Sequence, residues 1–171
     1  MHPSSLATMK QFRATLPDKG SVLDVGSLDI NGSYRYLFDG WNYTGLDIVA
    51  GLNVDYVPDD PYDWKELKDN SFDAVICGQT VEHIETPEKT FAEIARVLKP
   101  GKPICVIAPT VGGSHHEPWF RDVTIDYMTE LAEAAGLEVK NCTVTNQSVW
   151  YDCILIASKP KQVKDDGKSK S

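Results

Sequence analysis

Short apolar runs alternate with amphipathic segments along most of the chain. Runs rich in Val and Ile with few polar interruptions are typical of strands buried on both faces of a parallel sheet. The sequence predicts five such strands before residue 110. The predicted strands are Ser21–Val25, Tyr43–Ile48, Val54–Val57, Phe72–Cys77 and Ile104–Ala108.

Apolar residues at helical spacing lie outside these runs and predict three helices. The first covers Ser4–Leu16. The second covers Pro87–Leu98, where Thr86 is a suitable N-cap and Pro87 suits the first helical position. The third covers Thr124–Ala135 and ends at a glycine. Alternation of strands and helices favours a three-layer α/β domain with a mostly parallel sheet.

The end of the chain follows a different pattern. Residues 137–145 and 148–157 are both strand-like, and only two residues, 146–147, separate them. A connection this short permits only an antiparallel hairpin. We therefore expect one domain over residues 1–158, with its sheet closed by this hairpin. Residues 159–171 are charged and poor in large aliphatic side chains, which predicts a disordered tail.

Composition narrows the partners. The formal net charge of −8 disfavours charge-driven binding to nucleic acid or to an anionic membrane. The four cysteines form no C-x-x-C pair, and no apolar run reaches the roughly 20 residues of a membrane span. With no signal-like N-terminus, the chain is expected to be cytoplasmic. We expect a small-molecule partner, and a monomer or a homodimer.

The first candidate site follows the first strand. Gly26 permits a tight turn and the close approach of a ligand, and a helix beginning there would offer free N–H groups. Asp24 adds an acceptor that suits a cationic ammonium better than a phosphate. Alternatively, Gly26 serves only the turn and Asp24 only a cap.

Two further segments are expected at the same edge of the sheet. Asp47 ends the second strand, where a carboxylate accepts ribose hydroxyls of either S-adenosylmethionine (SAM) or NAD. Residues 78–84 follow the fourth strand, where open α/β sheets bind ligands. His83 in this segment is a candidate base, because its ordinary pKa is near 6.5. It is equally a candidate for packing on a cofactor or capping a helix.

Taken in order, these segments resemble class I SAM-dependent methyltransferases of the type 11 group. The resemblance covers roughly residues 20 to 158. The matching motifs are Val22–Gly26, Tyr43–Asp47, Asn70–Val75, Val81–Ile84 and Arg96–Gly101.

The resemblance implies a Rossmann-like, seven-stranded sheet with an antiparallel last strand, and SAM as cofactor. It places Asp24 and Gly26 under the methionyl group and Asp47 on the ribose. The other cofactor contacts that it implies are Ile48 on the adenine, Asp60 on the adenine amine, and Gly78, Gln79 and His83 beside the methionyl group.

The chain departs from the family after its first glycine. The usual second glycine is replaced by Leu28, so the turn is expected to differ in shape. Ser27 and Asn31 are candidates to supply the polar contacts that backbone would otherwise give. Arg35 is either a partner for the SAM carboxylate or a solvated helix charge.

The acceptor side is expected in the polar, glycine-hinged segment 112–122. His115 is a second candidate base. His115, His116 and Glu117 are adjacent, and adjacent side chains rarely converge on one ion, so no metal site is predicted.

The predicted activity is in-line transfer of a methyl group from SAM to an O, N or C nucleophile of a small molecule. One alternative is a non-catalytic SAM-binding or scaffold protein on the same fold. Another is a nicotinamide-dependent oxidoreductase, which the missing G-x-G-x-x-G run disfavours.

Overall fold

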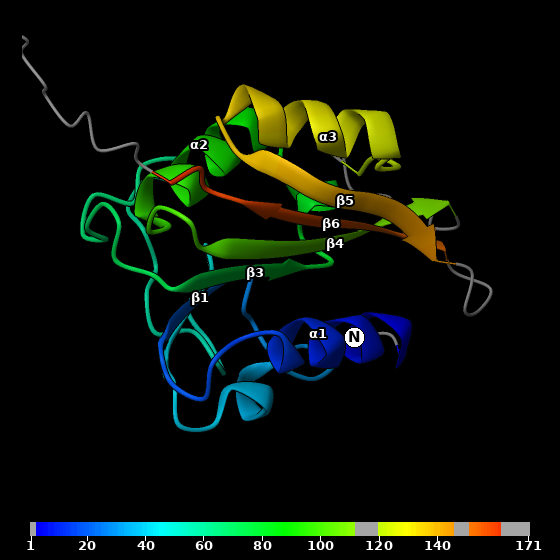
Figure 1. Ribbon diagram of the computed structural model, residues 1–171. Helices are drawn as coiled ribbons and strands as arrows, with labels where there is room; N and C mark the ends of the chain where they lie inside the picture. The colour runs from blue at the N-terminus through cyan, green and yellow to red at the C-terminus, as the bar shows by residue number, and fades with distance from the viewer. Residues whose placement is uncertain (1–2, 112–119, 146–150, 162–171) are drawn as a thin grey trace, which may run out of the picture.

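A mixed sheet of six strands organises the residues that this computed structural model describes, 3–111, 120–145 and 151–161. The sheet has the order β2-β1-β3-β4-β6-β5 (Figure 1). The strands are β1 (Ser21–Val25), β2 (Asn42–Leu46), β3 (Ala74–Gly78), β4 (Pro103–Val111), β5 (Glu138–Thr145) and β6 (Tyr151–Ser158).

One strand, β6, runs opposite to the other five. The strands β2, β1, β3 and β4 are parallel to their neighbours, whereas β6 is antiparallel to both β4 and β5. The predicted C-terminal antiparallel hairpin is thereby confirmed, although its connection lies outside the described residues. All four parallel strands end at one edge of the sheet, and β6 begins there because it runs the opposite way.

The predicted strand at Val54–Val57 is wrong. This segment makes a single bridge, between Tyr56 and Leu46, and no ladder. The Asp55 carboxylate instead accepts a hydrogen bond from the Gly45 N–H (2.8 Å). The Asp55 and Tyr56 N–H groups do donate to the Gly45 carbonyl, but the Gly45 N–H goes to a side chain and not to a backbone carbonyl. The pairing therefore does not extend into a ladder, and the described residues form six strands rather than seven.

Helices cover both faces of the sheet, as three layers require. The helices are α1 (Pro3–Ala14), α2 (Pro87–Val97) and α3 (Ile125–Ala134). Figure 1 shows α2 and α3 on one face and α1 on the other. The expected α/β architecture is therefore confirmed, with helix ends within one or two residues of the prediction.

Two apolar cores lie on the two faces. Phe91 and Ile94 of α2 pack in one core with Met128 of α3. Met9 and Phe12 of α1 lie in the second core, together with Phe38, Trp41 and Tyr43 of the segment that precedes and enters β2. Burial of these side chains removes apolar surface from water and supplies most of the driving force for folding.

The N-cap positions of α3 and α2 differ. Thr124 caps α3, because its side-chain oxygen accepts a hydrogen bond from the Tyr127 N–H (3.2 Å). Thr86 occupies the N-cap position of α2, but its side chain makes no capping bond.

The connection from β1 to β2 contains no α-helix. A 3-10 helix, η1 (Arg35–Phe38), is its one helical turn. The expectation of a helix beginning at Gly26 is therefore wrong. The face that such a helix would cover is filled by α1 and by the side chains of η1.

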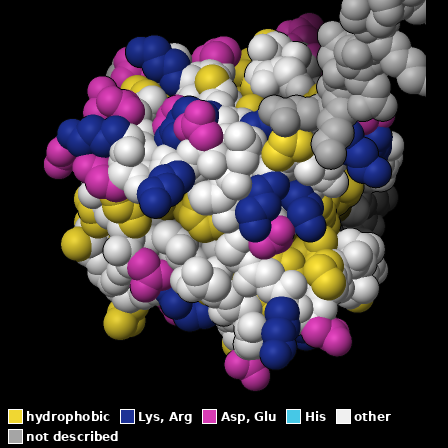
Figure 2. Space-filling model, turned by 60° about the vertical axis from the view of Figure 1, so that its left-hand side comes forward, with side chains coloured by type: hydrophobic (Ala, Val, Ile, Leu, Met, Phe, Trp, Pro, Cys, Tyr) yellow, Lys and Arg dark blue, Asp and Glu magenta, His cyan; other side chains and the backbone are white. Residues whose placement is uncertain are grey.

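Charged side chains of both signs are mixed on the face shown in Figure 2. Ion pairs show the same pattern: Arg96 binds Asp69 and Glu93, and Lys99 and Lys102 flank Asp73. Among the described residues, no helix has both the length and the apolarity to cross a bilayer.

Candidate functional site

The carboxyl ends of the neighbouring parallel strands β2, β1 and β3 lie side by side. From β1, the chain continues to β2 on one side, while β3 lies on the other. Open α/β sheets bind ligands beyond the strand ends at such a reversal of strand order. The segments that follow β1, β2 and β3 therefore form the candidate site, and most of the predicted residues lie in them.

Gly26 forms the floor of the turn after β1. Its φ of +76° lies in the left-handed region, and a Cβ there would lie 2.1 Å from Thr80 Oγ1. The N–H groups of Gly26 and Ser27 both donate to the Leu46 carbonyl, at 2.8 and 3.0 Å. The turn thus has the glycine that was expected, but its first N–H groups are used within the protein.

The segment that lacks the second glycine packs on the loop after β2. Leu28 covers Gly51, where its Cδ1 would lie 2.4 Å from an added Cβ. The Asp29 N–H donates to the Leu52 carbonyl (3.0 Å). The leucine is therefore accommodated by a glycine on the opposite loop, and the two loops are joined through backbone.

The two residues expected to compensate for Leu28 have different surroundings. Ser27 is buried, and its hydroxyl donates to the Asn53 carbonyl (3.2 Å). Asn31 is exposed in the middle of the loop. Ser27 thus fastens the two loops together, whereas Asn31 faces solvent at the rim of the site.

Asp24 is buried on the α1 face of β1. It is 3% exposed, and the Tyr43 hydroxyl donates to its carboxylate. Burial raises the pKa of Asp24 to about 7, although the Tyr43 hydrogen bond and the charge of Arg35 oppose this. Burial also raises the pKa of Tyr43, so the phenol stays a donor. The site therefore contains a carboxyl group that changes charge near neutral pH.

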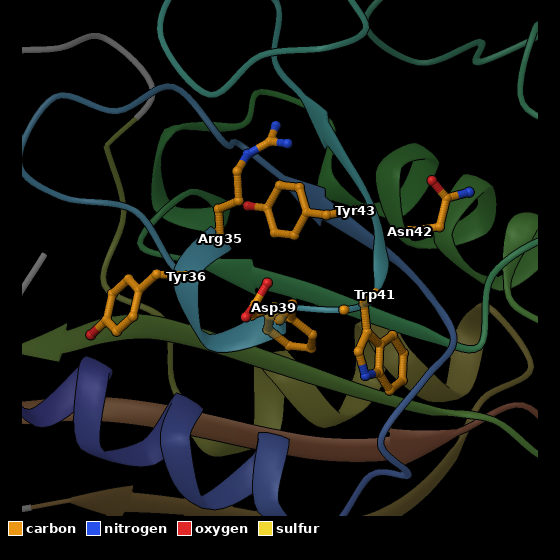
Figure 3. A pocket seen from close by; sticks show the side chains of 8 residues that line it. Arg35, Tyr36, Asp39, Trp41, Asn42 and Tyr43 are labelled. Atoms are coloured by element: carbon orange, nitrogen blue, oxygen red, sulfur yellow. The ribbon is translucent and has the colours of Figure 1, made fainter.

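Arg35 is partly exposed, but its guanidinium is bound by partners within the protein. Its guanidinium lies 4.2 Å from the centroid of the Tyr43 ring and donates to the Asn53 side-chain oxygen (2.6 Å). It also forms an ion pair with Asp55. Figure 3 shows Arg35 beside the Tyr43 ring. Two roles were considered for Arg35, a partner for the SAM carboxylate and a solvated charge. The contacts favour neither, because they bind the guanidinium to Tyr43, Asn53 and Asp55.

Asp47 follows the last residue of β2 and reaches back to the first loop. Its Oδ2 accepts from the Leu28 N–H (3.0 Å), and its Oδ1 accepts from the Val49 N–H (3.2 Å). The next residue, Ile48, is 63% exposed. A fixed carboxylate beside an uncovered aliphatic side chain can accept vicinal hydroxyls and support a flat apolar ring.

Asp60 stands apart from these residues. It is exposed, and its side chain accepts from the Tyr62 N–H (2.8 Å) in a local turn. Its hydrogen bonds with Tyr62 and Asp63 stay within this turn, so its assignment to an adenine amine gains no support from geometry.

The segment after β3 supplies the opposite wall. Gly78 lies under the Tyr34 ring, whose hydroxyl oxygen would lie 2.7 Å from an added Cβ. Gln79 has a φ of +58°, and its amide points to Asp152 and Ser5. Thus Gly78 marks a point where the backbone is approached closely, while the Gln79 side chain turns toward α1.

His83 ends a short 3-10 helix, η2 (Val81–His83). Its side chain is 38% exposed, and its Nε2 lies 3.8 Å from Glu82 Oε1. Its ring packs against Phe120, with the centroids 5.7 Å apart. His83 is therefore partly accessible and close to a buried carboxyl group. His115, His116 and Glu117 lie outside the described residues.

Several residues of this region were missed by the sequence interpretation. Tyr34 and Tyr43 were not among the expected site residues, yet one covers Gly78 and the other binds Asp24. Asp152 and Ser5 were not considered. Asp152 carried a signal, because it is a carboxylate at the start of an otherwise apolar strand.

Two surface hollows flank η1. One, of about 770 Å³, is bordered by residues 29–36 and 52–55, beside the turn after β1. The other, of about 570 Å³, is lined by residues 35–43 (Figure 3). The second includes Asn42, at the amino end of β2, and so lies away from the strand ends. The first hollow borders the loops that follow β1 and β2.

Known proteins resemble this chain in sequence and in fold. Residues 23–106 match the family described as a methyltransferase domain. A ubiquinone biosynthesis O-methyltransferase of Hahella chejuensis is 33% identical over 102 residues, which are 52% of this chain and 42% of that protein. A demethylmenaquinone methyltransferase of Renibacterium salmoninarum is 28% identical over 141 residues, 75% of this chain and 55% of that protein. The chain thus spans about half the length of these relatives.

A solved structure has the same fold. It is the 1,6-didemethyltoxoflavin-N1-methyltransferase of Burkholderia thailandensis, with bound 1,6-didemethyltoxoflavin and S-adenosylhomocysteine. Its TM-score is 0.75 at 16% identity, over 92% of this chain and 79% of that one. Residues 23–106 therefore belong to a methyltransferase domain, and the fold around them is that of the class I SAM-dependent methyltransferases.

Proposed function

We propose that this chain binds SAM at the ends of β1, β2 and β3 and transfers its methyl group to a small-molecule acceptor. One observation carries the proposal. Asp47, at the end of β2, is fixed by the Leu28 and Val49 N–H groups and stands next to the exposed Ile48. Each carboxylate oxygen has further acceptor capacity, which suits the two hydroxyls of a ribose.

The charges around the turn fit the other half of SAM. Its sulfonium and ammonium groups are cationic, and Asp24 and Asp47 flank Gly26 in the chain segments that meet there. Asp24 stabilises a nearby cation when it is ionised, and a bound cation in turn favours ionisation of this carboxyl group. An anionic pyrophosphate would meet two acidic side chains here, which disfavours a dinucleotide.

Methyl transfer from SAM needs little acid–base catalysis by the protein. SAM supplies a methyl group already activated by the positive sulfur. The protein aligns the acceptor and excludes water. Gly78 makes room for the Tyr34 ring, which covers the backbone at the end of β3. His83 is our candidate to take a proton from the acceptor, since it is partly exposed and lies beside Glu82.

The first acceptor class to test is a quinol-like aromatic ring. Two curated relatives are named for ubiquinone biosynthesis and for demethylmenaquinone. Such rings offer a phenolic oxygen or a ring carbon as nucleophile, which lies within the O, N or C range expected from the sequence. An oxygen nucleophile arrives protonated at neutral pH and would use His83 as the base.

The test begins with cofactor binding measured by calorimetry. S-adenosylhomocysteine should bind the wild type. D47A should weaken this affinity by about tenfold, because loss of the ribose hydrogen bonds costs roughly 1.4 kcal/mol of binding free energy. The matched control is D39A. Asp39 is also an exposed carboxylate, but it lines the hollow that lies away from the carboxyl ends of the strands. It should leave the affinity unchanged.

Other outcomes separate the alternatives. Stabilisation by NAD and not by S-adenosylhomocysteine, seen as a higher melting temperature, would indicate an oxidoreductase. Binding of neither would indicate a scaffold protein on this fold. Binding that D47A leaves intact would refute the ribose assignment alone.

A further inference from the structure

A buried carboxylate lies at the start of β6, outside the residues assigned to the cofactor. Asp152 is 0% exposed and pairs in register with Pro109 of β4. Because β6 is antiparallel to β4, this start lies at the edge where β3 and β4 end. A charged group is therefore buried directly beside the wall of the candidate site.

The donors that the described residues bring to Asp152 are uncharged. Its Oδ2 accepts from the hydroxyls of Ser4 (2.8 Å) and Ser5 (3.1 Å), and its Oδ1 accepts from Gln79 Nε2 (2.9 Å). Both serines belong to the first turn of α1, where the helix dipole favours a negative charge. An apolar residue of similar size avoids the desolvation cost of a buried carboxylate, so its presence calls for a role other than stability.

Gln79 is the residue through which such a role can act. Its φ of +58° lies in the left-handed region, which is unfavourable for a residue with a β carbon. Three bonds hold it there. Its N–H donates to the Ile107 carbonyl (2.7 Å), and its side-chain amide donates to Asp152 and to Ser5 (3.1 Å). The Asp152 bond thus offsets part of the cost of this turn.

The position of Gln79 sets the path of the proposed cofactor wall. It stands between Gly78, under the Tyr34 ring, and Thr80, which packs on Gly26. A change in the backbone at Gln79 moves both contacts. A Gln79 that relaxes to negative φ would shift the backbone facing the cofactor.

We propose that Asp152 is a positioning residue for the cofactor site, which acts by holding Gln79 and so the backbone of residues 78–80. The inference rests on the proposed function, because it assigns the effect of Asp152 to SAM binding. Asp152 touches no cofactor itself. Through Ser5, which also binds Gln79, it further joins the first turn of α1 to this wall.

The experiment compares S-adenosylhomocysteine affinity with melting temperature in the full chain. In D152A, both carboxylate oxygens are removed, so Gln79 and the two serines lose their shared acceptor. In Q79A, the side-chain anchor is lost while the left-handed φ remains unfavourable. Both variants should weaken binding by about tenfold. The matched control is S4A, which removes one donor to the same carboxylate but leaves the Gln79 bond in place.

S4A should lower the melting temperature and keep the affinity within about twofold of the wild type. A merely structural Asp152 gives a different result: D152A and Q79A would then bind as tightly as S4A, and the proposal is overturned. If D152A does not fold, the comparison of Q79A with S4A decides the question in the same way. If the wild type binds no S-adenosylhomocysteine, the proposed function fails first, and this inference fails with it.

Discussion

Gly26 and Thr80 come from the turns after two neighbouring strands, β1 and β3, and pack directly against each other. A Cβ on Gly26 would lie 2.1 Å from Thr80 Oγ1 and 2.3 Å from its Cγ2. Real carbon atoms do not approach oxygen or carbon this closely without displacing one of them. The glycine therefore serves two purposes, a left-handed backbone at φ +76° and room for the opposite wall.

G26A should lower the free energy of unfolding by about 3 kcal/mol, through left-handed strain and overpacking together. G40A is the matched control. Gly40 has a similar φ, +80°, but an added Cβ would meet nothing within 4 Å. It should cost only about 1 kcal/mol. Urea unfolding at constant pH measures both, and equal losses would show that the contact with Thr80 is unimportant.

Elements that bury a regular apolar pattern could be predicted from the sequence. The runs at β1, β3 and β4 are apolar on both faces, and the structure places them side by side in the centre of the sheet. The helix stop at Gly136 could also be predicted, since it depends only on a few neighbouring residues.

Features that depend on contacts distant in sequence could not be predicted. Val54–Val57 is apolar enough for a strand, but the Asp55 carboxylate takes the Gly45 N–H at the edge of β2. The turn after β1 contains the expected glycine, but the N–H groups of the turn donate to the Leu46 carbonyl on the neighbouring strand β2. The bond between Tyr43 and Asp24 joins two strands, and no local pattern shows it.

D24N should change how stability depends on pH. Burial raises the pKa of Asp24 to about 7 from its ordinary 3.8. The folded protein therefore holds this proton more tightly than the unfolded chain, and stability falls as pH rises between these values. D24N has no carboxyl group at this position, so it does not pay the cost of ionising a buried carboxyl group as pH rises. Its free energy of unfolding relative to wild type should rise by about 4 kcal/mol from pH 4 to pH 8.

The control for D24N is D39N, which removes an exposed carboxylate near η1. Denaturant unfolding of the three proteins from pH 4 to pH 8 gives the comparison. D39N should run parallel to wild type throughout. If D24N also runs parallel, Asp24 is ionised in the folded protein over this whole range, and the proposed neutral-pH charge change at the site is wrong.

D73N should show the opposite dependence at the other end of β1. Although burial opposes ionisation, hydrogen bonds from Lys99 and Ser21 lower the pKa of Asp73 to about 2. A lowered pKa gives stability that is present above the unfolded value of 3.8 and is lost as pH falls toward 2. At pH 7, D73N should therefore be less stable than wild type by about 2 kcal/mol, and the two should converge near pH 2.

Lys102 also faces this carboxylate, at 3.4 Å, so K102M provides a milder variant of the same site. A D73N deficit that persists unchanged at pH 2 would mean that Asp73 contributes through packing and not through its charge.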